Sequence, residues 1–137
     1  MKKTLLVAAL TGLMLSACAS HHDHERHMNA PRNPLNTLVS IVDGKQIVVS
    51  QEPIYFAKEM QNVRVTWHLQ PDSKYMFGKD GIVVADAREE IVDCRPAPDG
   101  KSFSCLNRHT KPGKYKYTIR LEGTPAIAPL DPMMENG

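Results

Sequence analysis

Residues 111–122, Lys-Pro-Gly-Lys-Tyr-Lys-Tyr-Thr-Ile-Arg-Leu-Glu, carry the clearest structural signal in the chain. Apolar side chains stand at every second position from Tyr115 to Leu121, and lysine, threonine and arginine fill the positions between them. An alternation of this kind predicts a β-strand with one buried face and one solvent-facing face. Residues 63–69, Val-Arg-Val-Thr-Trp-His-Leu, repeat the pattern. We therefore expect two antiparallel strands, with Trp67 on a core face.

Shorter β-rich runs surround these two strands and are separated by turn residues. Asp43-Gly44 lies between two such runs and is a strong hairpin signal, while Pro53 is typical of an edge strand. Together, about seven or eight short strands predict an all-β domain over residues 36–123, an antiparallel β-sandwich or small barrel. The additional expected strands are 38–42, 45–49, 53–56, 81–85, 90–94 and 102–106, with one helical turn at 57–60.

Residues 124–137 contain Pro125, Pro129 and Pro132. Proline favours extended backbone and interrupts regular hydrogen bonding. We expect this segment to be a proline-rich tail that lies along the surface or is mobile.

The N-terminus has the order of charges and apolar residues found in secretory signals. Lys2 and Lys3 precede an apolar stretch that reaches Leu15, and the small residues Ser16 and Ala17 follow. The stretch is shorter than the ~20 residues of a transmembrane helix. A buried N-terminal helix is the alternative, but the segment is not amphipathic and a polar run follows it. We expect residues 1–17 to be a signal peptide.

Leu15-Ser16-Ala17-Cys18 resembles the lipobox of bacterial lipoproteins. The resemblance implies cleavage before Cys18 and acylation of that cysteine, with palmitate among the attached chains. Several acyl chains together anchor a protein stably to a membrane. The implied location is a membrane surface facing the periplasm. Ala19 stands where an aspartate would favour the inner membrane, so the outer membrane is the preferred expectation.

The chain has three cysteines, so assigning Cys18 to lipid leaves Cys94 and Cys105. Two cysteines in an oxidising compartment indicate one disulfide bond. A thiol pair or a metal pair is the alternative. We favour the disulfide because the spacing matches neither a redox Cys-x-x-Cys motif nor a zinc knuckle.

Residues 18–35 are polar and rich in histidine, and we expect a disordered tether between the lipid and the domain. Neutral imidazoles bind zinc, copper and nickel, so loose binding of these metals is the alternative function for this segment. We favour the tether, because a compositional signal alone is not specific. The candidate metal ligands are His21, His22, His24 and His27.

The domain resembles cupredoxin-like and immunoglobulin-like β-sandwiches in two segments. Residues 63–67 are similar to their central strand, and residues 111–118 resemble the Pro-Gly-x-Tyr-x-Tyr start of a late strand. A blue-copper site requires a thiolate after that late motif, where Thr118 and Ile119 stand instead. The resemblance therefore implies the sandwich without its copper site.

No residue pattern indicates catalysis. The sequence has no phosphate-binding loop, dinucleotide fingerprint, His-Glu-x-x-His or Gly-x-Ser-x-Gly motif. His68 and His109 lack a neighbouring nucleophile, and we interpret both as facing solvent. We also interpret four acidic residues that lie close together in sequence as solvated surface. These four are Asp86, Glu89, Glu90 and Asp93. We therefore expect no enzymatic activity.

The formal charge of the full chain is +2, but residues 1–17 hold two of its 17 basic residues and none of its 15 acidic ones. A mature chain would be formally neutral, which gives no electrostatic reason to expect nucleic acid as a partner. A local basic stripe could meet an acidic envelope polymer, but we favour an ordinary solvated face. The stripe consists of Lys111, Lys114, Lys116 and Arg120.

These observations lead us to expect a membrane-anchored periplasmic lipoprotein. Its expected function is that of a non-enzymatic binding or assembly module of the cell envelope, with a protein or polymer partner. Capture or delivery of zinc, copper or nickel through the histidine tract is the alternative. An enzymatic function has the least support in the sequence.

Overall fold

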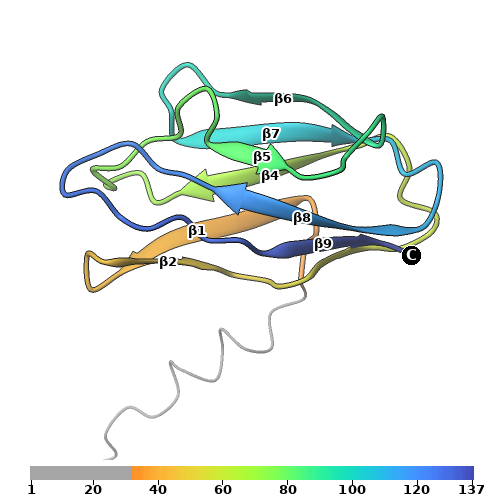
Figure 1. The fold of residues 1–137 in the computed structure, drawn as a ribbon, viewed down its shortest axis with the longest axis horizontal. Coiled ribbons are helices and arrows are strands. Elements are labelled where there is room, and N and C mark those ends of the chain that lie inside the picture. The colour runs from red at the N-terminus through yellow and green to blue at the C-terminus, as the bar shows by residue number, and fades with distance from the viewer. Residues whose placement is uncertain (1–31) are drawn as a thin grey trace, which may run out of the picture. The chain divides into compact units, whose positions relative to one another are not determined.

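The computed structural model describes residues 32–137, which form an all-β sandwich as expected (Figure 1). One sheet has the strand order β2-β1-β4-β7-β6 and the other has the order β3-β9-β8-β5. No helix occurs within these residues. The nine strands are β1 (Asn36–Val42), β2 (Gln46–Val49), β3 (Ile54–Phe56), β4 (Val63–Leu69), β5 (Ile82–Val84), β6 (Ile91–Pro96), β7 (Ser102–Asn107), β8 (Gly113–Ile119) and β9 (Met133–Asn136).

Both sheets are mixed, whereas the sequence predicts purely antiparallel ones. Strand β1 runs parallel to β4, with Asn36 opposite Thr66, and β3 runs parallel to β9, with Ile54 opposite Met134. Parallel neighbours require long crossover connections. Turn residues indicate the pairing of strands that follow each other directly in sequence. They therefore could not predict the β1–β4 and β3–β9 pairings.

The predicted hairpin turn at Asp43-Gly44 is confirmed, whereas the helical turn predicted at residues 57–60 is a single hydrogen-bonded turn and not a helix. Asp43 and Gly44 both have positive φ angles, 51° and 63°, and the N–H of Lys45 donates to the carbonyl of Val42 over 3.0 Å. Positive φ at both central residues is the geometry that Asp-Gly favours in hairpins. Residues 57–60 form a single turn, closed by a 2.8 Å hydrogen bond from the Met60 N–H to the Ala57 carbonyl.

The expectation of a C-terminal tail is wrong for residues 133–136. They form β9, which lies inside the second sheet between β3 and β8. Met134 is fully buried and stands opposite Tyr115. A run of Met-Met-Glu-Asn after several prolines has little intrinsic strand preference, so its pairing depends on the two flanking strands.

The core lies between the inward faces of the two sheets, and the alternation in β4 and β8 sets which side chains enter it. Trp67 and Tyr117 are fully buried, with ring centroids 5.2 Å apart. Burial raises the pKa of Tyr117 to about 12, because its anion would lose its hydration. The sequence placed Trp67, Tyr115 and Tyr117 on core faces, and all three are buried.

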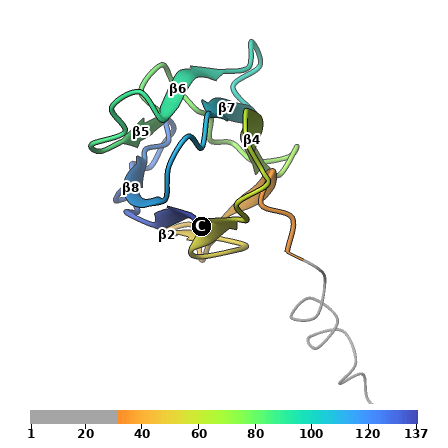
Figure 2. The same ribbon diagram turned by 90° about the vertical axis from the view of Figure 1, so that its right-hand side faces the viewer.

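The sandwich leaves one flank where two edge strands meet. Strands β5 and β6 are the last strands of their respective sheets. Figure 2 shows the two strands next to each other, and their residues are in contact. This flank positions the candidate site. Within residues 32–137, no helix has the length and apolar character needed to cross a membrane.

Candidate binding cleft

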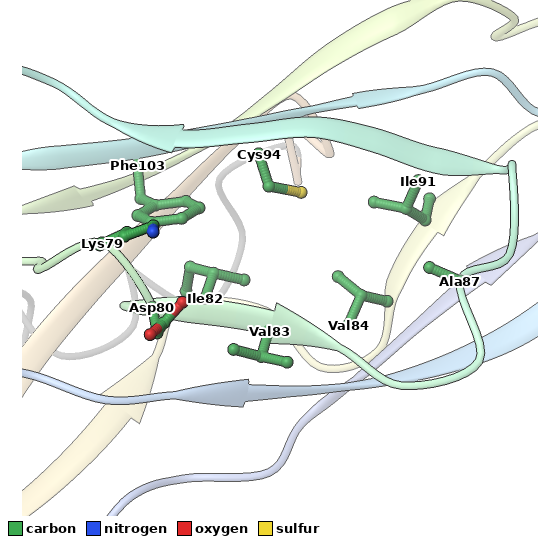
Figure 3. Close-up of a pocket in the computed structure, with 9 residues that line it drawn as sticks. All are labelled: Lys79, Asp80, Ile82, Val83, Val84, Ala87, Ile91, Cys94 and Phe103. Carbon is green, nitrogen blue, oxygen red and sulfur yellow. The ribbon is translucent and has the colours of Figure 1, made fainter.

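A cleft of about 290 Å³ opens between β5 and β6. Most of its lining is aliphatic or aromatic, and its two charged residues are neighbours in sequence. Figure 3 shows Ile82 and Val84 directed from β5 toward β6, whereas Val83 points away. The lining residues are Lys79, Asp80, Ile82, Val83, Val84, Ala87, Ile91, Cys94 and Phe103.

Strand β5, at the edge of the second sheet, is hydrogen-bonded to β8 on one side and has no neighbouring strand on the other. Val83 stands opposite Thr118 of β8. Flanking hydrogen bonds join the Ala85 N–H to the Lys116 carbonyl and the Arg120 N–H to the Gly81 carbonyl, each over 2.8 Å. Because hydrogen-bonded pairs alternate along antiparallel strands, the backbone groups between these positions face the open flank.

The other wall of the cleft contains a β-bulge closed by a disulfide. The register of β6 on β7 shifts between Val92 and Arg95, so Asp93 and Cys94 together face Cys105. Asp93 has a φ of 52°, which turns the chain at this point. Cys94 and Cys105 are bonded, with Sγ atoms 2.05 Å apart and Cα atoms 4.1 Å apart. The predicted disulfide is confirmed, and Cys94 brings it to the cleft wall.

On the outer side of the bulge, Asp93 bridges two arginines. Its carboxylate accepts hydrogen bonds from Arg64 Nη2 over 2.5 Å and from Arg95 Nη1 over 2.6 Å. The hydrogen bond from Arg64 lowers the pKa of Asp93, and the charges of both arginines act in the same direction. Asp93 is exposed, as the sequence suggested, but it is paired.

The expectation that Asp86, Glu89, Glu90 and Asp93 are all solvated is wrong for Glu90. It is buried, and its carboxylate accepts hydrogen bonds from the N–H of Thr110 over 2.8 Å and from the hydroxyl of Thr110. Burial raises the pKa of Glu90, but the hydrogen bonds from Thr110 and the charges of Lys111 and Arg108 lower it, and the net pKa lies below the usual value. Asp86 and Glu89 are exposed, as predicted.

His109 is also buried, contrary to its interpretation as a solvent-facing residue. Its Nδ1 lies 3.0 Å from the carbonyl oxygen of Met60 and its Nε2 lies 3.0 Å from an oxygen of Gly137. Its backbone N–H donates to the Asn107 side chain over 3.1 Å. His109 therefore connects three segments of one end of the sandwich, and no sequence motif marks this role. His68 is half-buried, with Nε2 2.9 Å from the Asn36 side-chain oxygen.

The basic stripe on β8 is partly neutralised by the segment that the sequence predicts as a tail. Lys114 lies 3.7 Å from Glu135, and Lys116 lies 3.8 Å from Asp131. These pairs are largely exposed, so each contributes little to stability. They nevertheless reduce the net positive charge of this face and weaken the case for an acidic polymer as its partner.

Cys18 and the four histidines of the tract lie outside residues 32–137, so lipidation and metal binding remain predictions. Within the described part of the chain, no three or more histidine, cysteine, aspartate or glutamate side chains are grouped in a way that could hold a metal ion.

Comparison of the chain with models of protein families and with curated protein sequences found no match. The cleft must therefore be interpreted from its own chemistry. Sequence reasoning predicted a strand at 81–85 but not the cleft beside it. The sequence feature that could have indicated an edge strand here is the short apolar run Ile82-Val83-Val84, with charged residues near both ends.

Proposed function

We propose that this protein is a membrane-anchored lipoprotein that faces the periplasm and acts as a non-enzymatic binding or assembly module of the envelope. The signal-like N-terminus and the lipobox ending at Cys18 support this location. The disulfide between Cys94 and Cys105 supports an oxidising compartment, because such bonds persist there and are rare in the cytosol.

The cleft between β5 and β6 is the observation that carries the proposed binding role. The cleft combines aliphatic and aromatic side chains with polar surface in about equal exposed share, and a concave site of apolar side chains with some polar groups is typical of ligand sites. Among the described residues, this lining contains no imidazole, no hydroxyl and no free thiol, since Cys94 is bonded to Cys105. Its ionisable groups are Lys79 and Asp80, both exposed to solvent, whereas perturbed catalytic groups are usually desolvated, so we favour binding over catalysis.

The anchor is tested by metabolic labelling with an alkyne analogue of palmitate in a Gram-negative host. We expect the native chain to be labelled and to fractionate with membranes. Cys18→Ala should lose the label and leave the membrane fraction, while a Cys94→Ser, Cys105→Ser double variant should keep the label. Label retained by Cys18→Ala would contradict the lipobox assignment.

The binding role is tested by a photo-crosslinking amino acid at Val83, whose side chain is 41% exposed on the outer face of β5, next to the backbone edge that borders the cleft. We expect a discrete adduct in intact cells from this position. Leu38, exposed to 42% on the other sheet, is the matched control and should give no such adduct. Failure to form an adduct at Val83 above the Leu38 level would remove the support for binding at the cleft.

A further inference from the structure

We propose that the free edge of β5 binds an extended, uncharged polypeptide segment as an added strand, with apolar side chains of that segment entering the cleft. This inference rests on the proposed binding function and specifies the chemistry of the partner. It depends on three features of one flank: unpaired backbone groups, an adjoining cleft with aliphatic and aromatic side chains, and nearby charges that do not attract an anion.

The backbone of β5 presents both hydrogen-bonding groups of two residues to the flank. Val83 faces Thr118 across the β5–β8 ladder. The intervening residues Ile82 and Val84 consequently direct their N–H and C=O groups away from β8. Neither residue has a backbone hydrogen-bond partner on that side within residues 32–137. An extended polypeptide supplies donors and acceptors at the matching spacing, as in other cases of strand addition.

The cleft provides space for side chains of such a segment. In a strand, alternate side chains point to the same face, so a strand added beside β5 would direct one set inward, next to Ile82 and Val84. That set would reach the space bounded by Ile91 and Phe103 on the opposite wall. At about 290 Å³, the space lies at the lower limit of ordinary small-molecule pockets, which suits a few side chains.

The charges near β5 disfavour an anionic occupant. Lys79 and Asp80 precede the strand and balance each other, whereas Asp86, Arg88 and Glu89 follow it and carry one net negative charge. None of the ion pairs among the described residues involves these five. An anionic polymer would gain no net attraction at this edge, whereas an apolar peptide would lose little on leaving water.

The other edges differ from β5 in ways that make them useful controls. Pro53 immediately precedes the edge strand β3. The edge strand β6 contains the bulge and ends at Pro96. Prolines and bulges both discourage the pairing of a further strand with an edge. On β2, the Ser50 N–H donates to the Leu38 carbonyl of β1. Because residues that face β1 alternate along the strand, the neighbouring Val49 directs its N–H away from β1, to the free edge. The cleft beside β5 contains no residue of β2.

The test uses the purified full chain in detergent micelles and a displayed library of random heptapeptides. We expect enrichment of peptides with alternating apolar residues and no net charge. The most enriched peptide is then synthesised, together with versions methylated at successive backbone nitrogens. Methylation at alternate positions should weaken binding at least tenfold, because those N–H groups donate to β5, and methylation at the intervening positions should not.

Three variants assign the binding to the edge. Val84→Pro removes the outward N–H without removing a bond to β8, and it should weaken binding of the synthetic peptide at least tenfold. Val84→Ala keeps the N–H but shortens a side chain that faces the cleft, so it should weaken binding clearly less than Val84→Pro. Val49→Pro makes the same backbone change on β2 and should bind like the native chain. Thermal unfolding identifies any variant that does not fold, in which case the methylated peptides on the native chain decide.

Two results would overturn the inference. One is that no heptapeptide is enriched over a matrix without protein. The other is that the peptide binds but tolerates methylation at every position and the Val84→Pro change. If crosslinking at Val83 nevertheless succeeded in cells, the binding function would stand and strand addition would be excluded.

Discussion

The end of the sandwich around His109 and the flank between β5 and β6 satisfy their polar groups in opposite ways. Around His109 the buried polar groups are paired: Asn107 and Asn136 exchange two side-chain hydrogen bonds, of 2.7 and 3.2 Å, and Glu90 accepts from Thr110. Along β5, by contrast, backbone groups and apolar side chains remain available. A buried network of this kind holds one geometry, whereas an open edge can accept a partner.

The largest expected effect comes from removing the centre of the paired end. His109→Ala leaves the Met60 carbonyl without the imidazole donor and creates a small cavity among buried groups. We expect a loss of about 3 kcal/mol in the free energy of unfolding, measured by urea denaturation. His68→Ala, on the half-buried outer face, should cost about 0.5 kcal/mol. Equal losses in the two variants would mean that the His109 contacts do not stabilise the fold.

Breaking the disulfide should have the next largest effect, and it acts on the cleft side. The Cys94→Ser, Cys105→Ser variant opens a loop with a sequence separation of 11 residues. We expect a loss of about 2–3 kcal/mol in the free energy of unfolding. The native chain treated with reductant should match the variant. A variant as stable as the oxidised native chain would show that the bulge holds β6 in place without the bond.

Glu90 makes the stability of the paired end depend on pH. Its folded-state pKa lies below the ordinary value of a glutamate, so the folded state favours the carboxylate. The stabilisation is therefore complete above the unfolded pKa and is lost as the pH falls through the folded one. Unfolding midpoints from pH 6 down to about 3 should fall more steeply in the native chain than in Glu90→Gln. Asp86→Asn, at an exposed site, is the control and should keep the native slope.

The smallest expected effect lies in the cleft itself. Ala87→Leu adds apolar volume to a lining position that is only partly buried. We expect the free energy of unfolding to change by less than about 1 kcal/mol, because the added atoms enter open space. The crosslinking yield at Val83 should fall, since the space is occupied. A loss of several kcal/mol would indicate that the cleft is tightly packed rather than open.

Local patterns in the sequence were sufficient for much of the sandwich. The two-residue alternation in 63–69 and 113–119 identified the buried faces, and Asp43-Gly44 identified a hairpin. Cys94 and Cys105 were paired from the cysteine count and the expected compartment. Each of these signals depends on neighbouring residues or on composition, which a sequence shows directly.

The features that sequence reasoning missed depend on segments far apart in the chain. The strand at 133–136 has little preference of its own and forms because β3 and β8 flank it. His109 is buried by the Met60 turn and by the residues at the end of β9, neither of which is near it in sequence. The cleft arises because β5 and β6 are edges of different sheets, and no local pattern reports which strands become edges.

The position of β9 inside the second sheet also constrains the order in which the chain can fold. Strand β3 comes early in the chain, yet its neighbour in the sheet is β9, with Ile54 opposite Met134. Until β9 is in place, β3 has no strand to join and β8 keeps an open side. We expect closure of the second sheet to be a slow step of folding, because contacts over such long sequence separations form slowly. A chain truncated before Met133 would expose two strand edges that the complete sheet conceals, which favours aggregation.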